Sequence, residues 1–145
     1  MIKIIVIGKL KEKYLIEAVN DYKKRINKYH KLEIVEIKDT NIYNEEKEII
    51  SLINKNEYIL LLDIFGKEYS SVEFSNKLQN LFNSSNSNIT FIIGSSEGVT
   101  EKIKEIANEK ISFSKFTFPH GLFRVILLEQ LYRSFKIINN EKYHK

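Results

Sequence analysis

The sequence has 145 residues, of which 43% are hydrophobic and 29% are charged, a composition typical of a single globular domain. It contains no cysteine, and this absence excludes both a disulfide framework and a thiolate metal site. The net charge of +4 is a mild basic excess. Such an excess fits either a lysine-rich solvated surface or a polyanionic partner such as RNA, and charge alone does not decide between them.

No segment reaches the roughly 20 apolar residues that a membrane span needs. The apolar run over residues 2–7 is ended by Gly8 and Lys9, too early for a signal peptide. The three histidines lack the spacing of metal ligands. We therefore expect a soluble, cytoplasmic protein that has no membrane segment and no metal site.

The first third of the chain predicts two strands and two helices. Residues 2–7 form a near-continuous β-branched run, which is typical of a strand buried on both faces. Apolar residues then recur at helical spacing from Tyr14 to Ile26. Residues 32–37 predict a second strand. The next helix is expected from Asn44, which can cap an acidic first turn.

The middle of the chain continues the alternation of strand and helix. The predicted elements are, in chain order, a strand at 58–64 ended by residues 65–67, a helix from Ser70 or Ser71 to Leu81, a polar loop at 83–88, a strand at 89–94 and a helix at 100–110. Strands that alternate with helices indicate an α/β fold with a mainly parallel sheet and flanking helices. In such sheets, ligands bind beyond the carboxyl ends of the strands.

The familiar nucleotide and hydrolase motifs are missing. The turn after the first strand, "GKLKEK", lacks the glycines of a dinucleotide-binding loop, and the sequence has no P-loop and no nucleophile elbow. Two strand ends remain as candidate sites. One is Leu62 with Asp63, and the other is Gly94 with the small polar turn that follows it. Each could approach a ligand or be an ordinary turn.

A change of phase interrupts the apolar pattern near the C-terminal third. Apolar residues fall at positions 111 and 113 and then at 116 and 118, so the alternation shifts at Ser114 and Lys115. A regular strand cannot bury all four, and a bulge or a crossing loop must intervene. Pro119 follows, and proline is well suited to the start of a helix.

The helix expected over residues 121–138 is apolar on nearly all sides. One arc comprises Val125, Leu127, Leu128, Leu131, Tyr132 and Phe135. The other side carries Leu122, Phe123, Ile126 and Ile137 among polar residues. A helix of this kind is buried on nearly all sides, which in so small a protein predicts a second subunit and hence a homodimer.

Two polar residues near the start of this helix are candidate site residues. Arg124 lies within the apolar arc, where a guanidinium is costly unless it is paired or binds an anion. It either snorkels to water from the first turn or faces a pocket. His120 is either a packed turn residue or a site residue.

Several stretches together resemble one known family. They are "VIGKLKEKY", "LLDIFGK", "IIGSSEG", "SFSKFTFPHGLFRVILLEQLYRSFKI" and the terminal "YHK". The chain resembles, from end to end and as a single domain over residues 1–145, the RlmH family of small SPOUT-class methyltransferases, which modify a pseudouridine of 23S ribosomal RNA. It departs from the family in having Ser95 where a second glycine is usual, and in a shorter segment around residues 39–47.

The resemblance implies a C-terminal trefoil knot that holds S-adenosylmethionine. The matching cofactor-binding positions are Leu62, Gly94, Phe113, Ser114, Lys115, Phe116, Thr117 and Phe118. The methyl acceptor would be N3 of the pseudouridine, an imide nitrogen whose proton must leave with the help of a base or of an electrostatic setting that favours the anion. Candidates for this help are His144, His120, Arg124 and Glu97, and the sequence does not rank them.

The C-terminal tail is a further candidate. A tail of this kind usually frays, but Tyr143 could stack on the target base and His144 could accept the N3 proton or bind a phosphate. The residues between Ile138 and His144 give a reach of about 17 Å. We expect this reach to carry the tail across a dimer interface to the partner's cofactor pocket.

With only +4 net charge the protein offers few contacts to phosphates, so we expect 23S ribosomal RNA within the assembled ribosome as the substrate rather than naked RNA. Two other hypotheses remain open. One is a ribosome-binding module with the same fold and no activity. The other is a SPOUT methyltransferase that acts on tRNA. Binding of S-adenosylmethionine distinguishes the enzyme from the inactive module. Methyl-transfer assays on ribosomes and on tRNA distinguish the two kinds of methyltransferase.

Overall fold

The computed structural model, which describes residues 1–85 and 87–145, contains one sheet of five parallel strands. The strands are β1 (Ile2–Ile7), β2 (Leu32–Ile37), β3 (Glu57–Glu68), β4 (Asn88–Ile93) and β5 (Glu109–Ser112). Their order across the sheet is β2-β1-β4-β3-β5, and every neighbouring pair is parallel. The predicted parallel sheet is therefore confirmed. The predicted polar loop at 83–88 contains residue 86, which lies outside the described residues.

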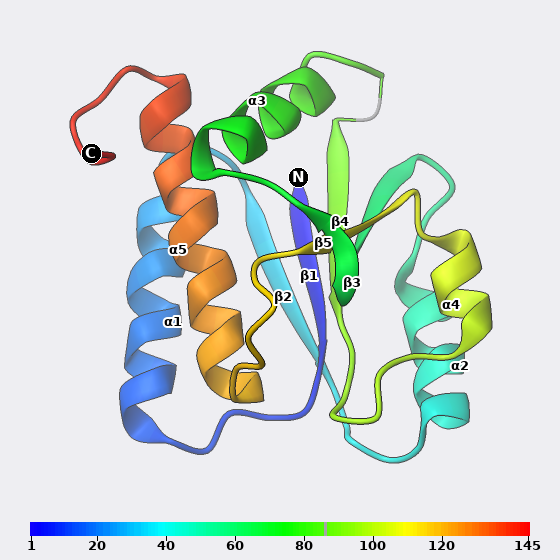
Figure 1. Cartoon of the computed structure of the whole chain (residues 1–145). Helices are drawn as coiled ribbons and strands as arrows, with labels where there is room; N and C mark the ends of the chain where they lie inside the picture. The colour runs from blue at the N-terminus through cyan, green and yellow to red at the C-terminus, as the bar shows by residue number, and fades with distance from the viewer. Residues whose placement is uncertain (86) are drawn as a thin grey trace.

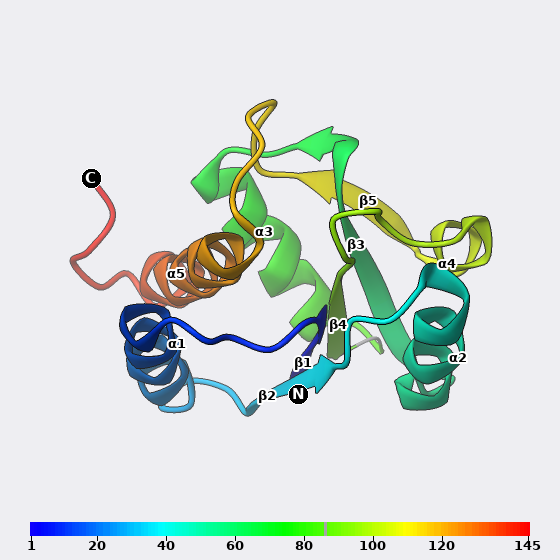
Figure 2. The ribbon, with the colours of Figure 1, turned by 90° about the horizontal axis from the view of Figure 1, so that it is seen from below.

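Helices cover both faces of this sheet (Figures 1 and 2). On one face lie α1 (Lys13–Ile26), α3 (Ser71–Phe82) and α5 (His120–Ile138), and on the other lie α2 (Ile42–Leu52) and α4 (Glu101–Ile106). In β1, Ile2 and Ile4 pack toward the first group, whereas Ile5 and Ile7 pack toward the second. The strand is thus buried on both faces, as its β-branched run predicts.

Two helix starts are set by side chains that accept hydrogen bonds from the first turn. In α3, Ser70 and Glu73 form the reciprocal capping box, which confirms a serine cap. In α2 the cap is Asn41, whose side chain accepts from the backbone N–H groups of Tyr43 and Asn44. The predicted cap at Asn44 was wrong by three residues, because Asn44 is itself a donor within that turn.

The end of β3 and the helix before β5 also differ from the sequence prediction. The third strand does not end at residues 65–67 but continues to Glu68, with a shift of register against β5 between Leu62 and Lys67. The helix predicted over 100–110 ends at Ile106. Asn108 then pairs with Ile59 through both its backbone and its side chain, so the following residues join the sheet as β5.

The segment from Ser112 to Pro119 is an ordered loop that crosses from the sheet to α5, as the phase change predicts. Phe113 packs against Phe74 and Phe123, with ring centroids 5.8 Å and 5.5 Å away, whereas Phe116 is exposed. The loop is folded back on itself by hydrogen bonds around Ser114. The threading of this region as a trefoil knot stays a prediction.

Helix α5 buries the apolar arc that the sequence predicts. Leu127, Leu128, Leu131, Tyr132 and Phe135 are all buried, and Val125 is half-buried. On the opposite side Phe123, Ile126 and Ile137 are half-buried, and Leu122 is exposed. This second apolar side is therefore only partly covered within one chain.

Candidate functional site

A cavity of about 370 Å³ lies at the carboxyl ends of β3, β4 and β5, which are neighbours in the sheet. Its walls come from residues 61–65, 93–96, 98–99, 111–114 and 116–118, and α4 and α5 add Lys104 and Phe123. The volume lies in the range of small-molecule and cofactor sites, and the carboxyl edge of a parallel sheet is where such sites occur. We name this the cofactor cavity.

Most of the predicted cofactor residues meet in this cavity. Its lining includes Leu62, Gly94, Phe113, Ser114, Phe116, Thr117 and Phe118. Lys115 is exposed and does not line it. Asp63, which the sequence analysis named with Leu62, also lines the cavity, whereas the adjoining residues Phe65, Val99 and Phe123 were missed. Their signal was proximity, since each lies within a few residues of a predicted position or at the start of α5.

Gly94 lets the chain turn back tightly after β4. A Cβ atom at this position would lie 2.8 Å from Cγ1 of Val99 and 2.9 Å from the carbonyl oxygen of Gly98, so a larger residue would displace the turn. Gly98 takes the positive φ of +82° that closes the turn, and its N–H donates to the carbonyl of Ser95. Ser95 does not have a positive φ, so the backbone at this position does not require glycine.

Aromatic rings form one wall of the cofactor cavity. Phe123 of α5 lies between Phe113 and Phe118, with centroid distances of 5.5 Å and 6.0 Å. At the cavity, Phe116 and Phe65 are 80% and 94% exposed, which is unusual for phenylalanine. The wall and the exposed rings suit a flat, largely apolar group.

A second cavity of about 240 Å³ lies at the carboxyl ends of β1 and β4. We name it the acceptor cavity. It is lined by Ile7, Gly8, Lys9, Leu10, Glu12, Asp39, Ser95, Ser96, His120, Gly121 and Arg124. Ser95 and Ser96 also line the cofactor cavity, so the two cavities share the turn that follows β4.

Arg124 is held by an ion pair within the fold. Its side chain is 2% exposed, its Nη1 lies 2.5 Å from Oε2 of Glu36, and its Nη2 donates to the carbonyl oxygen of Gly8 at 3.1 Å. Burial opposes ionisation of Glu36, but the hydrogen bonds from Arg124 and from the N–H of Leu10 hold the pKa of this carboxyl below its ordinary value. Arg124 therefore does not snorkel, and it contributes to the wall of the acceptor cavity.

His120 ties the start of α5 to the end of β4. Its Nε2 lies 2.5 Å from the carbonyl oxygen of Gly94. A carbonyl oxygen only accepts hydrogen bonds, so Nε2 carries the proton of this bond. Within residues 1–85 and 87–145, no group donates a hydrogen bond to the other ring nitrogen, Nδ1.

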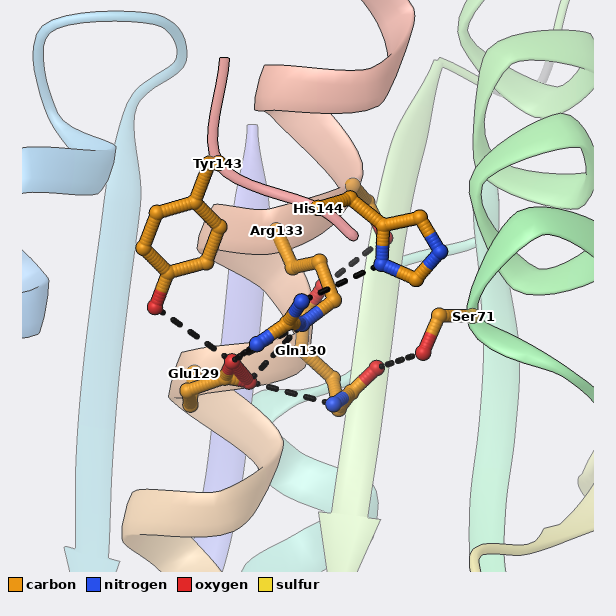
Figure 3. A network of polar contacts seen from close by, with 7 residues as sticks. Ser71, Glu129, Gln130, Arg133, Tyr143 and His144 are labelled. Atoms are coloured by element: carbon orange, nitrogen blue, oxygen red, sulfur yellow. Dashed lines mark hydrogen bonds and ion pairs between the residues drawn. The ribbon is translucent and has the colours of Figure 1, made fainter.

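The tail residues lie on the outer face of α5 (Figure 3). The hydroxyl of Tyr143 donates to Glu129 at 3.4 Å, and the guanidinium of Arg133 lies 4.8 Å from the Tyr143 ring. Nη1 of Arg133 lies 3.1 Å from Nδ1 of His144. Burial and the charge of Glu129 raise the pKa of Tyr143 to about 12, so its phenol stays protonated at neutral pH.

The structure thus brings the candidate residues together as two pairs rather than as one group. His120 and Arg124 lie at the carboxyl edge of the sheet, beside the cofactor cavity. Tyr143 and His144 lie farther along α5, against Glu129 and Arg133. Glu97 is exposed on the turn after β4 and does not line either cavity.

The described part of the chain has no group of three or more His, Asp or Glu side chains placed to hold a metal ion. Within the same residues, no helix has the length and apolar character needed to cross a membrane.

Comparison with known proteins identifies the family. The family model described as "Predicted SPOUT methyltransferase" matches residues 1–144. Proteins named ribosomal RNA large subunit methyltransferase H from Clostridium acetobutylicum and Enterococcus faecalis are 47% and 45% identical to this chain, and each match covers 99% of both sequences. The chain belongs to this family of SPOUT methyltransferases. The alignments span 157 positions, so the relatives carry residues that this 145-residue chain lacks.

Solved structures show the same fold at low sequence identity. A methylase family protein from Haemophilus influenzae has a TM-score of 0.57 at 7% identity, covering 96% of this chain and 66% of that one. A tRNA methyltransferase from Aquifex aeolicus has a TM-score of 0.55 at 18% identity, covering 91% of this chain and 69% of that one. These likenesses support the α/β fold of SPOUT methyltransferases and say nothing about the substrate.

Replacing Glu36 by glutamine should destabilise the protein, because it leaves the buried guanidinium of Arg124 without a counter-charge. Breaking a fully buried ion pair costs about 3–5 kcal/mol, and because the Glu36 side chain is 38% exposed we expect about 2 kcal/mol. Urea denaturation measures this loss in the free energy of unfolding. The control, Glu33→Gln on the same strand, should change it by less than about 0.5 kcal/mol.

The same pair makes stability depend on pH. Because the pKa of Glu36 in the folded protein lies below its ordinary value of 4.5, the ion pair contributes fully above pH 4.5. Its contribution is lost as the pH falls through the lower, folded pKa. The difference in the free energy of unfolding between wild type and Glu36→Gln should therefore shrink below pH 4.5. A difference that stays constant down to acid unfolding would show that Glu36 and Arg124 do not form a stabilising ion pair.

Proposed function

We propose that this protein transfers a methyl group from S-adenosylmethionine to N3 of a pseudouridine in 23S ribosomal RNA, within the assembled ribosome. The names of relatives that are 45–47% identical over their full length support the substrate class. The observation that carries the proposal is the cofactor cavity, which gathers seven of the eight positions that the family resemblance assigns to the cofactor.

The cofactor cavity fits S-adenosylmethionine in size and in chemistry. In this proposal Phe113, Phe118 and Phe123 pack against the adenine ring, and Leu62 and the backbone at Gly94 complete the wall. The absence of room for a Cβ at Gly94 is consistent with a backbone that must approach a ligand closely. When bound, the cofactor supplies a methyl group on a sulfonium centre and needs no metal ion.

The reaction also requires that the N3 proton leave the target base. His120 and Arg124 are the candidates from the chain that holds the cofactor, since the turn after β4 separates them from the cofactor cavity. Tyr143, kept protonated, would stack on the base or donate to it, and His144 and Lys145 would contact the RNA.

A homodimer would cover the second apolar side of α5. Within one chain this side leaves Leu122 exposed and Phe123, Ile126 and Ile137 half-buried. Oligomers of small soluble proteins are most often two-fold symmetric, so the same helix from each copy would meet at the interface. The Glu129–Arg133 ion pair lies on this side too, which would bring the tail of each chain close to its partner.

The length of α5 suggests that the tail would act on the partner's cavity. Helix α5 has 19 residues and is therefore about 28 Å long. The cavities adjoin its first residues, whereas the tail leaves its last, and the reach from Ile138 to His144 is only about 17 Å. In the single chain Tyr143 and His144 lie against Glu129 and Arg133 and line neither cavity, and in the proposed dimer they would complete the site of the other subunit.

Replacing Phe118 by alanine should weaken S-adenosylmethionine binding about tenfold, because loss of ring stacking costs about 1–3 kcal/mol. Isothermal titration calorimetry measures the dissociation constant. The matched control is Lys115→Ala in the same loop, which should bind normally because Lys115 does not line the cavity. Equal affinity for wild type and Phe118→Ala would show that the cofactor binds elsewhere.

Assembled ribosomes should accept a labelled methyl group from S-adenosylmethionine at least about 100-fold faster than an isolated stem-loop, because so few phosphate contacts cannot hold free RNA. Mass spectrometry of the 23S RNA locates the methyl group on the base. The proposal requires N3 of a pseudouridine. Efficient methylation of tRNA or of the naked stem-loop would contradict it.

Deleting residues 143–145 should leave dimerisation intact and slow methyl transfer about 100-fold, because stacking of Tyr143 on the target base is worth about 1–3 kcal/mol and each tenfold loss in rate corresponds to about 1.4 kcal/mol. Co-expression with Gly94→Val, whose cavity is blocked, tests whether the tail acts on the partner. Mixed dimers should restore about a quarter of wild-type activity, since half of the dimers are mixed and each has one complete site. No restoration would mean that the tail acts on its own chain.

A further inference from the structure

His120 lines the acceptor cavity beside Gly8. Its Nε2 donates to the carbonyl of Gly94 at 2.5 Å, so in the neutral ring the lone pair belongs to Nδ1. A Cβ atom built on Gly8 would stand 4.0 Å from Nδ1. Because glycine has no side chain, the space beside this nitrogen is free for a group that donates a hydrogen bond to it.

The charges around the acceptor cavity do not favour a phosphate. Among its lining residues, Lys9 and Arg124 are positive, and Glu12 and Asp39 are negative. The charge of Arg124 is moreover matched by Glu36. A neutral ring that both donates and accepts hydrogen bonds suits such a wall better than an anion does, and a pyrimidine base is a ring of this kind.

The position of the cavity also fits a methyl acceptor. It shares Ser95 and Ser96 with the cofactor cavity, so a group in it lies next to the cofactor across a single turn. Arg124 lines the cavity, and its guanidinium is already held by Glu36 and by the carbonyl oxygen of Gly8. Enzymes that modify a base take it out of its stack into a pocket of this kind.

We propose that the acceptor cavity receives the target base and that Nδ1 of His120 takes the proton from its N3–H group. This rests on the proposed function and adds the place of the base and the identity of the proton acceptor. The N3–H bond breaks and its proton goes to Nδ1. The nitrogen's electron pair forms the bond to the methyl carbon, and the bond from that carbon to the sulfonium sulfur breaks with its electrons left on sulfur.

The geometry ranks His120 above His144 for this role. Nδ1 of His144 lies 3.1 Å from Arg133, and a guanidinium only donates hydrogen bonds. The proton of a neutral His144 ring then stays on Nε2, so this residue offers a donor rather than a free lone pair. In the single chain this contact holds His144 away from the acceptor cavity, whereas His120 lines that cavity.

The substitution His120→Gln tests the roles of the two ring nitrogens separately. Its amide N–H₂ can still donate to Gly94, as Nε2 does, but it has no basic atom in place of Nδ1. For His120→Gln on ribosomes we expect kcat to fall about 10²- to 10⁴-fold. Its dissociation constant for S-adenosylmethionine and its dimerisation should match wild type. The matched variant His144→Gln keeps a donor and should lose less than about tenfold in kcat.

Rescue by imidazole distinguishes a role of His120 as a base from a purely structural role. His120→Ala should be slow, and added imidazole should restore its methyl transfer in proportion to the concentration of free base, because the base enters the space left by the ring. Imidazole should not accelerate Phe118→Ala, which keeps His120.

Three outcomes would overturn the inference. His120→Gln could keep the wild-type kcat, or imidazole could fail to rescue a slow His120→Ala. In the third, His120→Gln would lose kcat only to the extent that its affinity for S-adenosylmethionine also falls. These results differ from failure of the proposed function, in which wild-type protein would transfer no methyl group to ribosomes.

Discussion

A buried positive charge at the start of the last helix fixes how that helix meets the sheet. Arg124 is buried, and the two terminal nitrogens of its guanidinium are paired only where Glu36 at the end of β2 and the carbonyl of Gly8 after β1 both reach them. An unpaired guanidinium in this position would cost several kcal/mol, so α5 has little freedom to shift or rotate. His120, one turn earlier, adds the contact to Gly94 at the end of β4. Three strand ends are thereby joined to one helix.

The placement of α5 decides where the chemistry can occur. The loop before the helix must cross the carboxyl ends of β3, β4 and β5, and the cofactor cavity forms beneath it. The helix start itself separates this cavity from the acceptor cavity, with the turn after β4 shared between them. Because the far end of α5 lies about 28 Å from these cavities, the proposed function places the C-terminal tail in a different site from the one that its own helix builds. In the proposed dimer each chain would supply one half of two sites.

Strong local patterns predicted the sheet, both layers of helices and the loop at 112–119, since buried β-branched runs and a change of apolar phase leave few alternatives. The family motifs singled out positions that the fold gathers in one cavity, but spacing alone could not, because the loop and Gly94 meet only after the chain has crossed the sheet. Strand β5 was missed because "EKIS" has little apolar character and joins the sheet through Asn108, a long-range contact. The ion-pair partner of Arg124 could not be predicted from the sequence either, since Glu36 is 88 residues away in the chain.

The most direct test of this account is a crystal structure of the protein with S-adenosylhomocysteine. The account predicts that the ligand lies between Leu62, Gly94 and the loop 113–118, with the tail of the partner chain beside it and with Nδ1 of His120 facing the acceptor cavity. A ligand bound outside this cavity, or a dimer in which each tail stays on Glu129 and Arg133 of its own chain while the ligand is bound, would contradict it.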